Sequence, residues 1–168
     1  MPSSRLDEAM SADPRAIAEF FDRESLGAPE NAVGFILWRV VHRYQREIDR
    51  ALSPLNLTHL QFTTLAMAGW LCRTGEPVVQ VELARRAEMH VMQVSLMLKA
   101  LESKRLVARL RSVSDPRTKR VEITAAGLHT LRAAMPIAIA IQNRMFGAAG
   151  APNGALLNRL RDVENGDG

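Results

Sequence analysis

The sequence predicts a mainly α-helical fold with one small β-hairpin. Most of the chain repeats its apolar residues every three or four positions, as amphipathic helices do. Residues 106–111 and 120–123 instead alternate apolar and polar side chains, which is typical of strands. Ser114-Asp115-Pro116 between them favours a tight turn, because Asp bonds to nearby backbone and Pro fixes φ. These two runs therefore predict a hairpin with a strongly basic tip.

Capping residues mark where several helices begin. Asp13 precedes Pro14, and proline suits the first position of a helix. Thr58 lies three residues before Gln61 in the capping-box pattern, and Thr124 directly follows the second strand. The predicted helices, in chain order, span residues 13–23, 33–52, 60–71, 80–86, 91–103, 124–146 and 155–163.

The remaining segments connect these helices. Residues 1–12 are expected to be disordered, and Val78-Val79 to form a minimal strand. Pro136 is expected to bend the helix over 124–146, since it removes one backbone hydrogen bond. Residues 147–154 are a predicted linker, and the sequence contains no internal repeat.

Positive charge is concentrated in the middle of the chain. The 168 residues carry a net charge of +4. Residues 82–120 hold ten Lys and Arg against four Asp and Glu, a local charge of +6 that leaves −2 for the rest. A basic region in a slightly acidic frame is typical of nucleic-acid-binding proteins. The longest apolar run, 133–141, is too short to span a bilayer, so no membrane association is expected.

A helix-turn-helix is predicted for residues 80–103. Its apolar residues space two short helices across the turn 87–90, and Ala84 is small enough for a close helix crossing. A second helix that enters the major groove needs polar side chains near its N-terminus to contact base edges. The candidates for these contacts are His90, Gln93, Ser95 and, further along, Lys99.

The rest of the second helix is poor in charge. Met92 and Leu96 either contact thymine methyl groups or pack within the protein, and we favour packing. Most of the affinity is then expected from phosphate contacts made by hairpin cations. The candidates are Arg109, Arg111, Lys119 and Arg120. Arg117 at the tip has the length to enter a narrow minor groove, and Asp115 is expected to orient its guanidinium.

The order of these features resembles the multiple-antibiotic-resistance regulator (MarR) family. The matching motifs are the D-x-R of the wing at 115–117, the strand and T-x-x-G helix start at 121–127, the helix-turn-helix frame at 83–84 and 101–102, and the opening of a core helix at 57–62. The resemblance covers residues 33–163. The chain departs from the family at Val91 and Leu96, where Arg is frequent.

The resemblance implies a homodimeric, cytoplasmic transcriptional regulator with a winged helix-turn-helix fold. We expect it to act as a repressor. Dimerisation helices would lie at 13–57, the DNA-binding region at 58–123, and further dimerisation helices with a tail at 124–168. A helix around 17–21 is an extension expected to add dimer surface. The dimer would bind a pseudo-palindromic, double-stranded operator, and a small phenolic or aromatic carboxylate would release it.

An effector site is predicted where two helices would converge. The candidates are Trp38, Arg39 and His42 on the first and His59, Phe62 and Thr63 on the second. Together they would supply apolar walls and a few cationic or donor groups, which suits an aromatic acid. The alternative is that Trp38 and Phe62 are plain core residues and His42 is partly exposed.

Other functions have weaker support in the sequence. Cys72, the single cysteine, would sense peroxide if Arg73 lowered its pKa, but a small buried side chain is the favoured interpretation. The four histidines show no metal-ligand spacing, so no metal or cofactor is expected. The chain has no nucleophile elbow, phosphate loop or acid–base pair that would indicate an enzyme. A winged-helix module that binds protein instead of DNA stays open as an alternative.

Overall fold

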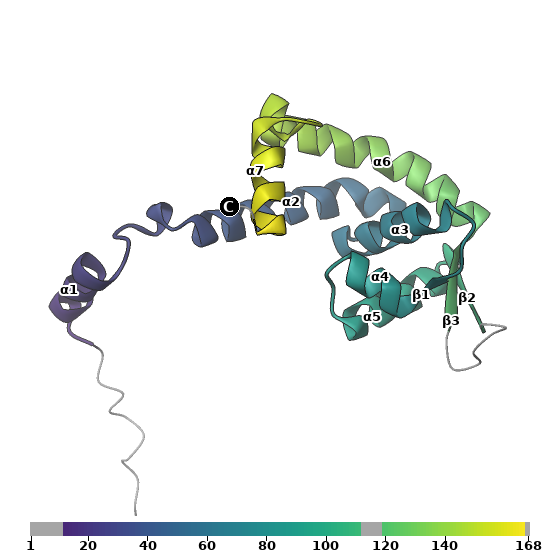
Figure 1. Ribbon diagram of the computed structural model, residues 1–168, viewed down its shortest axis with the longest axis horizontal. Helices are drawn as coiled ribbons and strands as arrows, with labels where there is room; N and C mark the ends of the chain where they lie inside the picture. The colour runs from purple at the N-terminus through teal and green to yellow at the C-terminus, as the bar shows by residue number, and fades with distance from the viewer. Residues whose placement is uncertain (1–11, 112–118, 167–168) are drawn as a thin grey trace, which may run out of the picture. The chain divides into compact units, whose positions relative to one another are not determined.

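The computed structural model describes residues 12–111 and 119–166, which belong to two compact units that divide inside one helix. The first unit ends at Arg43 and the second begins at Tyr44. Figure 1 shows the elements in chain order. The expectation of disorder in 1–12 falls almost wholly outside the described residues, as does the hairpin tip, 112–118.

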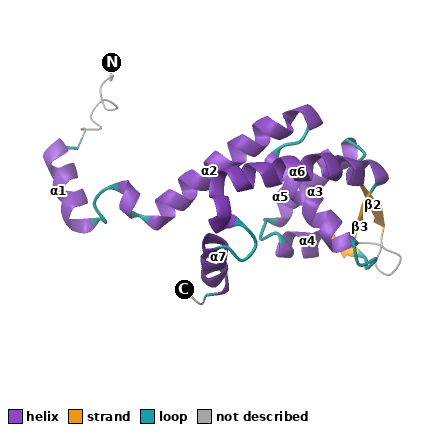
Figure 2. Ribbon diagram, turned by 90° about the horizontal axis from the view of Figure 1, so that it is seen from above, coloured by secondary structure: helices purple, strands orange, loops and turns teal. Residues whose placement is uncertain are grey.

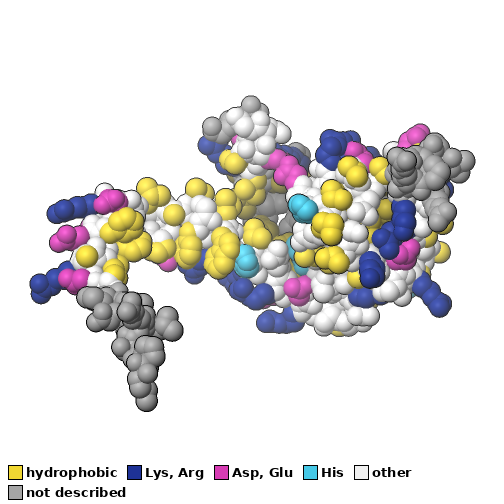
Figure 3. All heavy atoms as spheres, turned by 90° about the horizontal axis from the view of Figure 1, so that it is seen from below, with side chains coloured by type: hydrophobic (Ala, Val, Ile, Leu, Met, Phe, Trp, Pro, Cys, Tyr) yellow, Lys and Arg dark blue, Asp and Glu magenta, His cyan; other side chains and the backbone are white. Residues whose placement is uncertain are grey.

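The described part of the first unit, residues 12–43, consists of helices without a buried side chain. It contains α1 (Pro14–Glu24), the 3₁₀ turn η1 (Pro29–Asn31) and the first part of α2 (Val33–Leu52). Asp13 caps α1 as predicted, its Oδ1 accepting a hydrogen bond from the Arg15 amide at 2.9 Å. α1 has no buried residue. Figure 3 shows one face of this unit, and hydrophobic side chains cover much of it.

The second unit holds the rest of the chain around a central helix. Its further elements are η2 (Ser53–Leu55), α3 (His59–Cys72), β1 (Val78–Val79), α4 (Gln80–Arg86), α5 (Val91–Ser103), β2 (Val107–Arg111), β3 (Lys119–Ile123), α6 (Ala125–Phe146), η3 (Gly147–Gly150) and α7 (Ala155–Asn165). α3 packs against α4 and α5 on one side and α6 on the other (Figure 1). The predicted capping box at Thr58 and Gln61 is confirmed at the start of α3.

The core of the second unit draws on every helix around α3. Ile48, Leu65, Leu83, Leu98 and Leu101 have no exposed surface. Burying side chains of this size is the main stabilising contribution to a domain, at about 1.5 to 3 kcal/mol each. α6 continues through Pro136 as one helix.

Three antiparallel strands form the sheet, in the order β1-β3-β2. β2 and β3 make the predicted hairpin, with Val107 opposite Ile123 and Arg111 opposite Lys119. The minimal strand at Val78-Val79 is confirmed, and it extends the hairpin by pairing with β3. Figure 2 shows the strands together at one end of this unit.

The junction between β3 and α6 explains the T-x-x-G motif. Thr124 caps α6 by accepting a hydrogen bond from the Gly127 amide at 2.9 Å, and its hydroxyl donates to the Arg105 carbonyl at 2.7 Å. A Cβ on Gly127 would lie 2.0 Å from the Leu106 carbonyl oxygen. Glycine at position 127 therefore lets the start of α6 approach the Leu106 backbone, just before β2, more closely than a residue with a side chain would permit.

Candidate nucleic-acid interface and effector crevice

The turn between α4 and α5 is held by backbone and side-chain bonds. The Met89 amide donates to the Ala84 carbonyl at 3.0 Å, and Glu88 adopts a left-handed conformation with φ 49°. Gln80 Nε2 donates to the Val91 carbonyl at 3.3 Å, which joins the starts of the two helices. This pair has the helix-turn-helix arrangement that places a second helix in a major groove.

His90 has a structural role that the sequence interpretation missed. It is the N-cap of α5, and its Nδ1 accepts a hydrogen bond from the Met92 amide at 3.2 Å. The residue is exposed, so its other ring nitrogen remains available at the helix start. Of the other predicted base-contacting residues, Gln93 and Ser95 are half-buried and Lys99 is exposed.

The outward face of α5 is apolar, which corrects the expectation that Met92 and Leu96 pack within the chain. Met92 is 65% exposed and Leu96 60% exposed. The buried residues Val94 and Leu98 occupy the opposite face, because residues two positions apart lie on opposite sides of a helix. The pattern misled because α5 is apolar on both faces.

The hairpin cations have different surroundings. Arg109, which we expected on phosphate, has a side chain only 14% exposed, and its Nε donates to Glu102 Oε2 at 2.9 Å. This hydrogen bond lowers the pKa of Glu102, which favours the carboxylate form. Arg109 therefore joins β2 to the end of α5 within the protein. That geometry does not favour the predicted phosphate contact.

The other predicted hairpin residues lie nearer the tip. Arg120 pairs with Glu122 on the same strand, and Lys119 is exposed. Arg111 ends β2 opposite Lys119. Asp115 and Arg117 lie outside the described residues.

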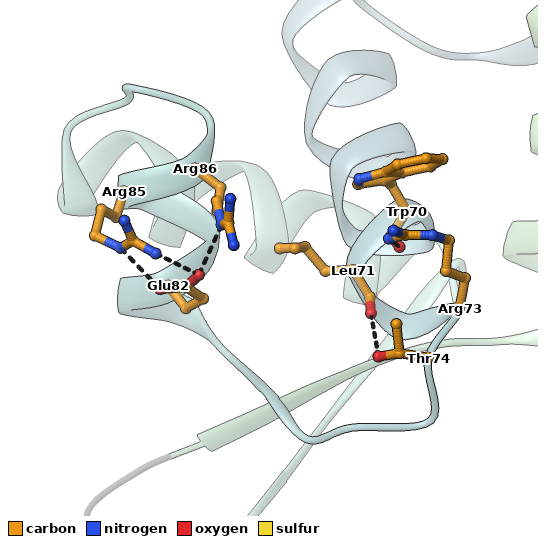
Figure 4. A network of polar contacts seen from close by, with 7 residues as sticks. All are labelled: Trp70, Leu71, Arg73, Thr74, Glu82, Arg85 and Arg86. Carbon is orange, nitrogen blue, oxygen red and sulfur yellow. Dashed lines mark hydrogen bonds and ion pairs between the residues drawn. The ribbon is translucent and has the colours of Figure 1, made fainter.

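A charged network on α4 was not predicted. Glu82 accepts hydrogen bonds from Arg85 Nη2 at 2.7 Å and from Arg86 Nε at 2.9 Å (Figure 4). These bonds lower the pKa of Glu82 to about 2. Two of the ten cations in the basic segment are thus partly neutralised, a pairing that the three- and four-residue spacing from Glu82 indicates in retrospect.

A hydrophobic crevice of about 720 Å³ lies between α3 and α6. Two predicted effector residues, Phe62 and Thr63, line it. The other lining residues are Ala66, Met67, Gly69, Trp70, Cys72, Arg73, Ile123, Leu128, Leu131 and Met135. The crevice therefore combines apolar walls with one guanidinium and one hydroxyl.

The other predicted effector residues lie elsewhere. His59 is half-buried and packs edge-to-face on Tyr44, with ring centroids 5.6 Å apart. Burial lowers the pKa of His59, although Asp49 opposes the shift. Trp38, Arg39 and His42 belong to the first unit, where His42 packs 4.3 Å from Trp38 between ring centroids and Arg39 pairs with Glu30. The structure thus brings Phe62 and Thr63 together, and it groups Trp38 with His42.

Cys72 has surroundings that oppose redox sensing. Burial raises the pKa of its thiol, which disfavours the reactive thiolate. Arg73, the predicted activator, instead stacks on Trp70 with its guanidinium carbon 3.5 Å from the ring centroid (Figure 4). Over the described ranges, no three His, Cys, Asp or Glu side chains group as a metal site requires.

Comparison with known proteins identifies the family. The MarR family pattern matches residues 57–119, which include α3, α4, α5 and β2. The HTH-type transcriptional regulator YdcH of Bacillus subtilis is 33% identical over 121 residues, which are 72% of this chain and 82% of YdcH. The chain belongs to the MarR family. It is therefore a DNA-binding transcriptional regulator with a winged-helix fold.

Other relatives of this MarR-family chain have been named by function or solved with ligands. The HTH-type transcriptional repressor Rv2887 of Mycobacterium tuberculosis is 29% identical over 140 residues, 83% of this chain and 98% of that protein. CouR from Rhodococcus jostii bound to p-coumaroyl-CoA matches with TM-score 0.67 and 28% identity, over 81% of this chain and 91% of CouR. CouR bound to a 23-mer DNA duplex matches with TM-score 0.70 and 27% identity, over 83% and 97%.

No helix within the described ranges combines the length and the apolar character that a membrane span requires.

Proposed function

We propose that this MarR-family protein is a homodimeric repressor that an aromatic acid releases from a pseudo-palindromic operator. Residues 58–123 would hold the DNA-binding region, and residues 13–57 and 124–168 the dimerisation helices. The observation that carries the proposal is α5, whose outward face is free while a basic hairpin follows it directly. The relative Rv2887 is named a transcriptional repressor, which supports repression over activation.

The dimer is supported by apolar surface that one copy leaves uncovered. Ile17, Phe20 and Phe21 on α1 are each 45% to 49% exposed. Further exposed apolar residues are Val33, Phe35, Ile36, Leu37, Trp38, Val41, Leu156, Leu160 and Val163. Apolar faces of this extent mark protein interfaces, and a two-fold dimer would present two α5 helices to successive major grooves.

The α3–α6 crevice is the proposed effector site. Its apolar walls suit an aromatic ring, and Arg73 at its edge supplies a cation for a carboxylate. The relative CouR has been solved with p-coumaroyl-CoA, which shows that a protein of this fold accommodates an aryl ligand. Ligand in the crevice would alter the packing of α3, which also carries α4 and α5.

Tryptophan fluorescence tests the effector site. The chain has two tryptophans, so a Trp38→Phe variant leaves Trp70, a lining residue, as the reporter. Titration with 4-hydroxycinnamate or p-coumaroyl-CoA should change Trp70 emission and release bound operator over the same concentration range. Arg73→Gln should weaken both effects, whereas the control Arg144→Gln, which breaks a pair with Glu47 instead, should leave them unchanged. Release of DNA without any change at Trp70 would place the effector elsewhere.

A further inference from the structure

We infer that the recognition helix α5 selects its operator chiefly through thymine methyl groups, which Met92 and Leu96 contact. The inference rests on the proposed operator binding. It extends that proposal by naming the chemical feature of the base pairs that the protein recognises.

The position of the two side chains is the first step. Val94, Leu98 and Leu101 are fully buried on one face of α5. With 3.6 residues per turn, Met92, Leu96 and Lys99 lie on the opposite face as one stripe. Met92 and Leu96 keep 65% and 60% of their surface exposed, so they add little to the core.

The chemistry of the major groove is the second step. Each base pair offers hydrogen-bonding groups there, but the C5-methyl of thymine is the groove's apolar contact. The commonest specific contact is made by Arg or Lys to guanine, and for this contact α5 offers no Arg and a single Lys, Lys99. Gln93 on the flank of the stripe has the bidentate geometry for adenine. Met92, Leu96 and Gln93 therefore all favour A·T pairs.

The stripe could contact either thymine methyl groups or the surface of another protein. Its position beside other DNA-binding elements favours thymine. Lys99 lies on the same stripe, and the basic hairpin follows the helix. The segment 82–120 carries a net charge of +6, which favours a polyanion over an average protein surface. We therefore assign the stripe to the groove.

Deoxyuridine substitution tests the inference, because it removes the methyl group and leaves the hydrogen-bonding groups unchanged. Duplexes selected from a random pool supply the operator, and each thymine is then replaced singly by deoxyuridine. Anisotropy titrations at fixed salt should show a loss of about 4-fold at each contacted position, as burial of one methyl group implies. Met92→Ala or Leu96→Ala should abolish that loss at its own position.

Control variants separate this inference from the operator proposal. Lys99→Gln should lower affinity and salt dependence but keep the sensitivity to deoxyuridine. Specific binding that no deoxyuridine substitution weakens would overturn the inference while operator binding stands. If Met92→Ala and Leu96→Ala change the oligomeric mass in solution instead of the deoxyuridine response, the stripe is a protein interface. Failure of the pool to yield any preferred duplex would instead contradict operator binding.

Discussion

Gly127 and His59 show how single residues decide local structure in this protein. At Gly127 the absence of a side chain lets α6 start against the Leu106 carbonyl. At His59 the imidazole packs on Tyr44, and its Nδ1 is buried without a hydrogen-bond partner among the described residues. Both side-chain choices affect stability in ways that can be measured separately from DNA binding.

Gly127→Ala should lower the free energy of unfolding by about 2 to 3 kcal/mol, because the new Cβ would lie 2.0 Å from a carbonyl oxygen. Urea denaturation followed by circular dichroism measures this change. Gly34→Ala is the matched control, since no heavy atom lies within 4 Å of its Cβ position and alanine favours a helix. Equal stability of the two variants would contradict the described α6 junction.

His59 should make stability depend on pH near neutrality. Burial holds the pKa of His59 below its ordinary value of 6.5 in the folded state. The unfolded chain therefore binds the proton first as pH falls below 6.5, and stability decreases until pH passes the folded pKa. The free energy of unfolding should fall less between pH 7.5 and 5.5 in His59→Phe than in the wild type. The exposed His129, changed to Gln, should leave the wild-type pH dependence intact.

At the scale of elements, the hairpin has separate anchoring and contacting residues. Arg109 is half-buried and pairs with Glu102 at the end of α5, whereas Lys119 is exposed on β3. The two cations were equivalent candidates in the sequence. In the structure their different burial predicts different phenotypes.

Lys119→Ala should reduce DNA affinity and lower the slope of log affinity against log salt by about one, with stability unchanged. Arg109→Ala should instead destabilise the fold, because it removes a side chain that is only 14% exposed and breaks its hydrogen bond to Glu102. Anisotropy at several salt concentrations and thermal melting distinguish the two. Loss of salt dependence in Arg109→Ala with an unchanged melting temperature would assign Arg109 to phosphate instead.

Local signals predicted the elements well, and non-local packing accounts for what was missed. Asp13, Thr58 and Thr124 cap helices as their sequence patterns indicate, because capping depends on residues within one turn. The pairing of β1 with β3 joins segments about forty residues apart in sequence, so no local pattern indicates it. The exposure of Met92 and Leu96 was missed because helical periodicity cannot choose between two apolar faces.

The candidate sites were also predicted only as far as local sequence patterns allow, because their remaining residues come from distant parts of the chain. Phe62 and Thr63 both line a crevice because α3 carries both, but the other wall comes from α6 and not from the helix over 33–52 that the prediction paired with it. The pairing of Arg109 with Glu102 depends on how β2 turns back on α5, which composition does not reveal. Charge counts therefore located the basic segment without showing which cations are already paired.

At the scale of the whole molecule, exposed apolar helices predict a dimer. Size-exclusion chromatography with light scattering should give twice the 18.6 kDa mass of one chain. Ile17→Glu combined with Phe20→Glu should shift this equilibrium towards monomer, since both side chains are nearly half exposed on α1. Arg15→Glu is the matched control for added charge on the same helix. A monomer in the wild type at micromolar concentration would contradict the dimer proposal.

Sequence-specific DNA binding is the central property, and the ratio of affinities for a selected and a scrambled duplex measures it most directly. The affinity of the wild type for a selected duplex and for a scrambled duplex of equal length should be compared between 50 and 300 mM salt. We expect the selected duplex to bind at least about 10³-fold more tightly, with affinity falling steeply as salt rises. Equal affinity for both duplexes at every salt concentration would contradict an operator-binding regulator.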